Sequence, residues 1–367
     1  MNAYLHIPFC TSICNYCDFT SFAGMEGRLG PYVDALVREI EGSNLLGPLK
    51  TVYFGGGTPS LLPSSRLEQV LGAMRAKAGF SPDIEISMEA NPETVDGERL
   101  QAYRALGVNR LSFGAQAAQK ELLKKMGRGH EWERVEGAFQ EARSAGFSNL
   151  NLDLMFGLSG QTLEMFQESL GKTLALGPDH LSLYALQVEP GTPLAKAVAE
   201  GLPLPSEDLV ADEYAYAQKT LVEAGYEQYE VSNFAKPGFH CRHNLNIWQG
   251  EDYWGFGLSA VGTVGPLRHG HGEDLTGYID QVEKGEGVLE FEELSPKTQA
   301  WERVMLGLRT QQGIGRSLLT DYLGGEPAAT KLKPLLGSGL LVEEGERLRV
   351  APQGYFVLNG ILERLAR

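Results

Sequence analysis

Three cysteines lie close together near the start of the chain, in the stretch HIPFCTSICNYCDF that spans residues 6–19. Cys10, Cys14 and Cys17 form the pattern C-x-x-x-C-x-x-C, and the fourth cysteine, Cys241, is far away in the sequence. A secreted disulfide framework spreads an even set of cysteines over a short chain. A bunched set of three in a long chain therefore indicates metal or redox chemistry.

Two kinds of site could use three such thiolates. A structural zinc site needs a fourth ligand, which His6 could supply, although His6 falls on a predicted strand. An iron–sulfur cluster is held by thiolates, and a four-iron cube with three protein ligands leaves one iron open to a small molecule. Tyr16, which directly precedes the last cysteine, favours the open cluster. A zinc-stabilised interaction protein is the alternative.

The elements that must position these cysteines alternate between strand and helix through the first 190 residues. Short apolar runs predict strands, and the segments between them have helical periodicity and often end in glycine, as at a left-handed C-cap. This alternation predicts an α/β fold with parallel strands, and six units favour a barrel or partial barrel over an open sheet. The predicted strands are residues 3–7, 51–55, 84–90, 110–115, 149–157 and 180–186, and the predicted helices include 32–42, 67–79, 97–107 and 131–146.

Polar or flexible residues come at or just beyond the ends of five of these strands. In barrels of this type one rim carries the site, so five such groups on one rim are hard to explain as packing. Each one alone could simply end a strand or cap a helix. The stretch GGGTPS lacks the lysine of a P-loop, and its glycines would let a backbone approach a ligand. The candidates are the cysteines, residues 55–58, Glu89, Gln116 and Asp153.

The chain changes character after the sixth predicted strand. Residues 191–235 suggest a return helix and linkers, and residues 236–260 are rich in glycine, histidine and tryptophan, which suggests loops over the site. His269 and His271 resemble a metal-binding pair, but two histidines in a glycine-rich loop are expected to be solvated.

The last part of the chain has the pattern of a small winged-helix domain. Residues 295–310 predict a helix, and residues 332–365 predict a helix, a hairpin turned at Glu344 and Gly345, and a final helix opened by Pro352. The segment has no basic stripe, so we expect it to pack or to bind a partner rather than DNA.

Composition limits the classes of function. The 367 residues suit one large domain and a smaller one. The net charge of −15 repels phosphate backbones, so we expect no nucleic-acid partner. No apolar run is long enough to span a bilayer, and no signal peptide is visible at the start, so we expect a cytoplasmic protein.

The three-cysteine motif and the strand that precedes it resemble the radical S-adenosylmethionine (SAM) superfamily, over about residues 1–235. The resemblance implies a partial (βα)6 TIM-type barrel and a [4Fe-4S] cluster on Cys10, Cys14 and Cys17. In that family the open iron takes the amino and carboxylate groups of SAM. Reduction by an external reductant then cleaves SAM to methionine and a 5′-deoxyadenosyl radical.

Further motifs narrow the resemblance to one group. YLHIPFC, FGGGTPS, SMEANPE, RLSFGAQ, MGRGH and NLDLMFGLSGQT look like the oxygen-independent coproporphyrinogen dehydrogenases and their relatives, the HemW heme chaperones. Carboxylates and an amide can hold ribose hydroxyls, and an arginine can fork onto a carboxylate. The resemblance implies that SAM is bound by Tyr4, Tyr16, Gly56, Gly57, Thr58, Glu89, Gln116, Arg128 and Asp153.

Three features favour the chaperone branch over the dehydrogenase. The dehydrogenase motif has a further cysteine where this chain has Phe19, and a longer segment before the cluster. The chaperones carry an H-N-x-x-Y-W motif, which residues 243–248 match except that Ile247 replaces the tyrosine. His243 is then the candidate heme ligand and Cys241 the alternative, because imidazole and thiolate both ligate heme iron.

The expected function is therefore a HemW-type heme chaperone that binds the cluster, SAM and heme. It would pass heme to acceptor heme proteins, whether soluble or membrane-bound. An active coproporphyrinogen dehydrogenase is the alternative, and the sequence leaves open whether the protein is an enzyme. We expect a radical SAM domain over residues 1–235, a loop-rich segment over 236–290 and a winged-helix-like domain over 291–367.

Overall fold

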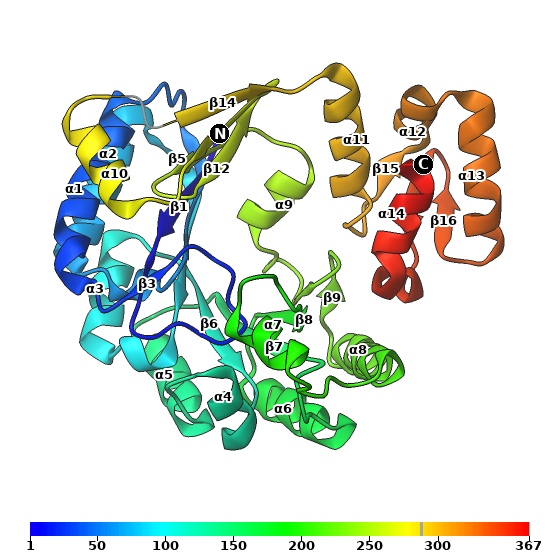
Figure 1. Cartoon of the computed structure of the whole chain (residues 1–367), viewed down its shortest axis with the longest axis horizontal. Helices are drawn as coiled ribbons and strands as arrows, with labels where there is room; N and C mark the ends of the chain where they lie inside the picture. Colours follow the sequence, from blue (N-terminus) through cyan, green and yellow to red (C-terminus); the bar gives the residue numbers. More distant parts are fainter. Residues whose placement is uncertain (287–288, 367) are drawn as a thin grey trace.

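The centre of the molecule is one long curved sheet, in a computed structural model that describes residues 1–286 and 289–366. Its twelve strands follow the order β14-β13-β12-β11-β1-β4-β5-β6-β7-β8-β10-β9, and the neighbours from β1 to β8 are parallel. The described sheet ends at β14 and β9, so the six inner strands form the predicted partial barrel (Figure 1). They are β1 (Asn2–Ile7), β4 (Leu49–Gly56), β5 (Phe80–Ala90), β6 (Arg110–Gln116), β7 (Leu150–Phe156) and β8 (His180–Ala185). The short strands β10 (Asn233–Ala235) and β9 (Glu227–Gln228) follow β8 at one edge of the sheet.

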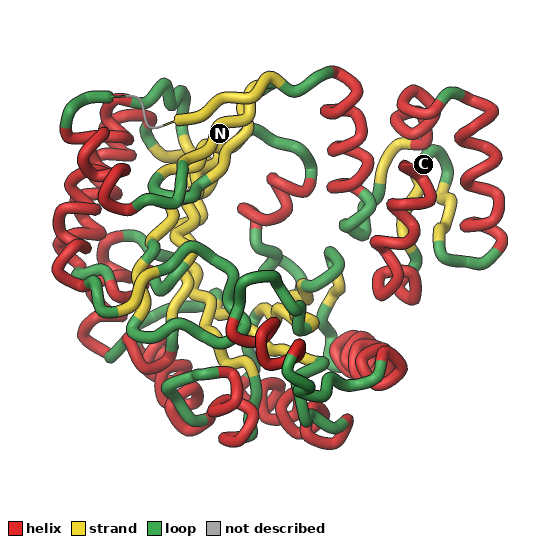
Figure 2. Tube along the Cα trace, viewed as in Figure 1, coloured by secondary structure: helices red, strands yellow, loops and turns green. Residues whose placement is uncertain are grey.

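Helices cover the outer face of this barrel and carry the crossover connections (Figure 2). Side chains of Asp96, Thr162 and Ser206 cap the starts of three of them, and Gly107 and Gly177 end two of them in the left-handed conformation. The helices are α1 (Leu29–Gly42), α2 (Ser64–Ala78), α3 (Gly97–Leu106), α4 (Lys120–Met126), α5 (Trp132–Ser144), α6 (Leu163–Leu176) and α8 (Glu207–Glu223). The short helix α7 (Pro193–Ala199) lies instead beside the loop that carries the cysteines (Figure 1).

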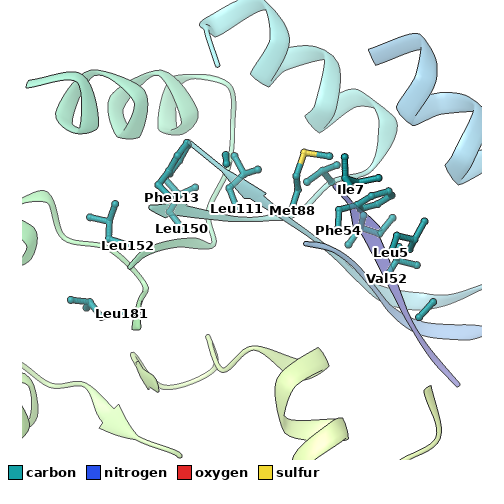
Figure 3. Packing of buried hydrophobic residues seen from close by; sticks show 14 of the residues in the cluster. Leu5, Ile7, Val52, Phe54, Met88, Leu111, Phe113, Leu150, Leu152 and Leu181 are labelled. Atoms are coloured by element: carbon teal, nitrogen blue, oxygen red, sulfur yellow. The ribbon is translucent and has the colours of Figure 1, made fainter. Parts of the chain in front are cut away.

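The inner strands separate their side chains by a period of two. On β6, Leu111 and Phe113 face outward into the apolar core, whereas Arg110, Ser112 and Gly114 line the inside of the barrel. The same alternation on the other strands builds one core between the sheet and the helices and leaves a polar interior. The outward residues labelled in Figure 3 are Leu5, Ile7, Val52, Phe54, Met88, Leu111, Phe113, Leu150, Leu152 and Leu181.

The segment after residue 236 differs from the loop-rich expectation, because much of it extends the sheet. β11 pairs in parallel with β1, and the next three strands continue the sheet antiparallel. The expectation that His269 and His271 are solvated is wrong: His269 is 2% exposed against Trp254, and the His271 ring pairs with Glu39. The elements are α9 (Arg242–Trp248), β11 (Tyr253–Phe256), β12 (Val261–Val264), β13 (Leu267–His271), α10 (Leu275–Glu283) and β14 (Leu289–Glu293).

The C-terminal part has its own three-stranded sheet and packs beside the β9 edge of the large sheet (Figure 1). Its hairpin turns at Gly345 and Glu346, one residue later than predicted, because Glu344 still pairs with Arg347 as the last residue of its strand. Pro352 opens a 3-10 helix (Pro352–Val357) rather than the last α-helix, which begins only at Leu358. Residues 287–288 and 367 of the predicted segments lie outside the described residues. The elements are α11 (Pro296–Gly307), β15 (Ile314–Gly315), α12 (Arg316–Leu323), α13 (Gly325–Gly337), β16 (Leu341–Glu344), β17 (Arg347–Val350) and α14 (Leu358–Ala366).

Within residues 1–286 and 289–366, no helix combines the length and the apolarity needed to cross a bilayer.

A buried glutamate makes the stability of the fold depend on pH. Glu213 of α8 accepts a hydrogen bond from the Gly157 backbone nitrogen at 2.8 Å, and burial raises the pKa of its carboxyl to about 7. Because the unfolded carboxyl loses its proton near its ordinary pKa of 4.5, stability should fall as the pH rises from about 4.5 to 7.

We predict that Glu213→Gln is more stable than the wild type by about 1–3 kcal/mol at pH 8 and has little advantage at pH 4.5. Urea unfolding of both proteins at the two pH values measures this difference. An equal difference at both pH values would show that Glu213 does not titrate as proposed.

Candidate functional site

A cavity of about 430 Å³ opens at the C-terminal ends of the inner strands. Residues from eight separate segments of the sequence line it, including most of those that the sequence singled out. The predicted site residues on its wall are Cys10, Cys14, Tyr16, Cys17, Gly56, Gly57, Thr58, Glu89, Gln116, Arg128 and Asp153.

The loop that carries the three cysteines is anchored to the barrel at both its base and its tip. At the base, the Gly57 and Thr58 backbone nitrogens donate to the Ile7 and Phe9 carbonyls at 3.0 and 2.7 Å. At the tip, the Asn15 backbone nitrogen donates to the Met126 carbonyl at 3.0 Å. The end of α4 and the start of the MGRGH stretch therefore help to fix the cysteines. β2 (Phe9–Cys10) and β3 (Phe22–Ala23) pair and close the loop.

His6 holds the returning end of the same loop. Its Nε2 lies 2.9 Å from the Thr20 carbonyl oxygen and its Nδ1 lies 3.2 Å from the Tyr4 hydroxyl. Because a carbonyl only accepts, Nε2 carries the proton and Nδ1 accepts from Tyr4. Both ring nitrogens are thus committed, and His6 is not available as the fourth ligand of a zinc site.

The three thiols share a wall of the cavity but do not converge on one point. Within the described ranges, no group of three or more histidine, cysteine, aspartate or glutamate side chains is arranged to hold a single metal ion. A four-iron cube attaches each thiolate to a different iron, so its ligands need not converge. Because His6 is engaged with Thr20 and Tyr4, a zinc ion on Cys10, Cys14 and Cys17 would lack the expected fourth ligand, and three thiolates suit a cluster with one open iron.

The glycines of GGGTPS serve packing inside the protein. A Cβ atom at Gly56 would lie 2.6 Å from the His6 ring, and one at Gly57 would lie 2.8 Å from the Phe9 carbonyl oxygen. Gly56 also has a φ of +106°. These glycines let β4 approach the base of the cysteine loop, and because Gly56 and Gly57 also line the cavity, the approach of their backbone to a ligand stays a prediction.

Arg128 links the cysteine loop to two strands. Its Nη1 lies 3.6 Å from the Cys14 sulfur and donates to Asn91 Oδ1 at 3.1 Å, and its Nη2 donates to the Gly114 carbonyl at 3.2 Å. Gly114 has no side chain to obstruct the guanidinium. A buried cation beside a sulfur stabilises the thiolate that iron requires.

Two carboxyl groups line the cavity deeper in the barrel. Glu89 accepts from the Tyr53 hydroxyl at 2.8 Å and from the Gly56 nitrogen at 3.2 Å, and Asp153 accepts from Asn151 at 2.7 Å. Burial raises the pKa of the Glu89 carboxyl to about 7. The hydrogen bond from Tyr53 opposes this rise, and the charge of Asp153 adds to it. Burial also raises the pKa of Asp153. A cationic or hydroxyl-bearing ligand would relieve this cost by donating to both groups.

Gln116 lines the cavity in a strained backbone conformation. Its φ is +66°, which an L-residue rarely adopts, and the pairing of β6 with β7 is irregular between Gly114 and Gln116. Backbone strain of this kind persists only where the surrounding structure holds the residue in place, and it often occurs at functional sites.

Three predicted residues lie outside the cavity wall. Tyr4 stacks on Tyr53 behind Glu89, with ring centroids 6.2 Å apart. Cys241 is fully buried, and burial raises the pKa of its thiol to about 12. His243 is 2% exposed, bonds Thr51 Oγ1 through Nδ1 at 2.8 Å, and has its pKa lowered by burial to about 3.

The helix that carries His243 closes the N-terminal end of the barrel, opposite the cysteines. Asn246 donates to Asn2 at the start of β1 at 2.8 Å. Glu85 of β5 accepts from the Arg242 and His243 backbone nitrogens at 2.9 and 3.1 Å. The H-N-x-x-x-W stretch is therefore a floor under the cavity, and only its Asn244 reaches the cavity wall.

Sequence reasoning missed several residues of the wall. Asn91 donates to Thr58 Oγ1 at 3.1 Å and accepts from Arg128, so it joins two predicted residues. Arg110 and Ser112 precede Gly114 on the same face of β6, and alternation within RLSFGAQ could have identified them. Tyr184 follows Ser182 on β8 in the same manner.

A partial parallel barrel with three cysteines at its C-terminal rim defines a radical SAM protein. The family model described as the Radical SAM superfamily matches residues 4–172, and the HemN C-terminal domain matches residues 294–357. The structure of coproporphyrinogen III oxidase HemN from Escherichia coli, described as a radical SAM enzyme, matches with a TM-score of 0.86 and 25% identity, over 99% of this chain and 89% of that one.

Curated relatives identify the branch of the superfamily. Proteins named heme chaperone HemW are 41% identical in Synechocystis (85% of this chain, 78% of that one) and 36% in Bacillus subtilis (98% and 97%). The Escherichia coli heme chaperone HemW is 34% identical over 99% of this chain and 97% of that one. This chain belongs to the HemW family of heme chaperones.

The strain at Gln116 leads to a stability prediction. Gln116→Gly should raise the free energy of unfolding by about 1 kcal/mol relative to Gln116→Ala, because both variants lose the amide and only glycine accepts a positive φ freely. Thermal or urea unfolding of the two variants measures the difference. Equal stabilities would mean that the backbone relaxes without strain.

Proposed function

We propose that this protein binds a [4Fe-4S] cluster, SAM and heme, and that it delivers heme to acceptor heme proteins. The observation that carries the proposal is the similarity, along 98–99% of the chain, to relatives named heme chaperone HemW. Several features remain predictions: the acceptor proteins, membrane-bound or not, the reductant, the cytoplasmic location and the lack of a nucleic-acid partner.

Cys10, Cys14 and Cys17 would hold the cluster, which when bound supplies an open iron and an electron to SAM. Burial raises the pKa of the Cys10 and Cys17 thiols. Since iron binds thiolates, assembly of the cluster must release these protons, and mildly alkaline conditions should favour it. Thr58, which donates to the Cys10 sulfur at 3.4 Å, and Arg128 beside Cys14 support the charged sulfurs.

The rest of the cavity wall suits the polar parts of SAM. Gln116, Glu89 and Asp153 offer one amide and two carboxyl groups, which can accept from ribose hydroxyls and an amino group. Gly56, Gly57, Thr58 and Tyr16 complete the wall beside the cysteines, and Tyr4 would act from behind through Tyr53.

The alternative function is oxidation of coproporphyrinogen, because the fold also matches that of HemN. Against it, the chain carries Phe19 at the position of the further cysteine in the dehydrogenase motif. Phe19 lies on the cavity wall and is 64% exposed, so no thiol is present at that point.

We propose His243 or Cys241 as a heme ligand only if the segment that carries them can move. Both side chains are buried, and Glu85 and Thr51 hold the segment that carries them. Heme could reach either residue only if α9 left the floor of the barrel.

The cluster assignment is tested by a matched pair of cysteine variants. We predict that Cys14→Ser loses the four-iron absorbance and most of the iron after anaerobic reconstitution, whereas Cys241→Ser retains both. Iron and sulfide assays with visible spectra measure this. Full iron retention in Cys14→Ser would contradict the ligand assignment.

The chaperone function is tested by two assays on one reconstituted, reduced preparation. We predict no repeated formation of protoporphyrinogen from coproporphyrinogen III with SAM, and transfer of bound heme to apomyoglobin, seen as the growth of the myoglobin Soret band. Multiple turnovers to protoporphyrinogen would establish the dehydrogenase instead, and heme that never leaves the protein would contradict a delivery role.

A further inference from the structure

Large apolar side chains gather at the mouth of the cavity. Ile13, Phe19 and Tyr184 line it and are 39%, 64% and 43% exposed. Such a group of exposed apolar side chains around one opening indicates a docking surface.

Two loops supply these side chains, and they are tied to each other. Ile13 and Phe19 belong to the cysteine loop, and Tyr184 belongs to the end of β8, which the connection to α7 follows. The Leu194 backbone nitrogen at the start of α7 donates to the Asn15 carbonyl of the cysteine loop at 2.8 Å. In Figure 1 the blue N-terminal loop runs across the barrel toward α7. The apolar mouth is therefore held in place on both sides.

We propose that this apolar mouth, formed by Ile13, Phe19 and Tyr184, is where the flat face of heme docks. The inference rests on the proposed function, because the family name supplies the cargo. A tetrapyrrole has two large apolar faces, and aromatic side chains stack on such faces. Asp18 and Glu189 also line the mouth, so the heme propionates face solvent, away from these carboxylates.

Burial of the other candidates supports this location. His243 and Cys241 lie under the floor of the barrel, with exposed fractions of 2% and 0%. The mouth, in contrast, is open in the structure as it stands and requires no displacement of α9.

A second explanation for the mouth is that it only shields bound SAM from water. SAM is polar and its expected partners are Glu89 and Asp153, so it does not require three bulky apolar side chains at the opening. The two explanations differ in the ligand whose affinity depends on the mouth.

The test is a heme titration by difference absorbance on the full-length reconstituted protein, with SAM affinity measured in parallel. We predict that Phe19→Ser combined with Tyr184→Ser weakens heme binding at least about tenfold and changes SAM affinity by less than about threefold. Phe291→Ser is the control, because Phe291 on β14 is equally exposed, at 63%, and is not on the cavity wall. It should leave heme affinity unchanged.

The outcomes separate this site from the proposed function. If the double variant still binds heme as tightly as the wild type, the mouth is not the site. The mouth is also contradicted if His243→Ala loses heme binding while its α-helical content stays intact. Loss of SAM affinity alone supports the shielding explanation and also contradicts the site. A wild-type protein that binds no heme contradicts the proposed function itself.

Discussion

The arrangement of the whole site depends on how the cysteine loop is pressed against the first two parallel strands. Backbone hydrogen bonds from Gly57 and Thr58 to Ile7 and Phe9 hold its base, and the His6 ring holds its return at Thr20. Each such bond contributes only about 1 kcal/mol, but together they fix a segment that would otherwise be free. The glycines are required because a side chain at Gly56 or Gly57 would occupy the space of His6 or of the Phe9 carbonyl.

The polar interior of the barrel follows from the same geometry. Alternation along the strands places Glu89 and Asp153 inside, next to the cysteines, and the outward residues build the core under the helices. These carboxyl groups are held with raised pKa values, which costs stability and prepares the cavity for a ligand that donates hydrogen bonds. The strained Gln116 is a further local cost at the same wall.

Much of the barrel and of its rim could be predicted from the sequence, because period-two strands, capped helices and spaced cysteines are local signals. Cys10, Glu89 and Asp153 lie on one cavity wall because parallel strands end at one rim. The placement of His243 could not be predicted, since burial beneath the barrel depends on Glu85 and on Asn2, which is more than 240 residues away. The sheet extension through β11 depends on equally distant pairing with β1.

The central claim is that three thiols at this rim hold a four-iron cluster with one iron open to SAM. Mössbauer spectroscopy of protein reconstituted with ⁵⁷Fe, before and after addition of SAM, tests it most directly. The account predicts a four-iron signal in which one site differs from the other three and changes when SAM is added. Four equivalent sites that do not respond to SAM, or no four-iron signal from a folded protein, would contradict it.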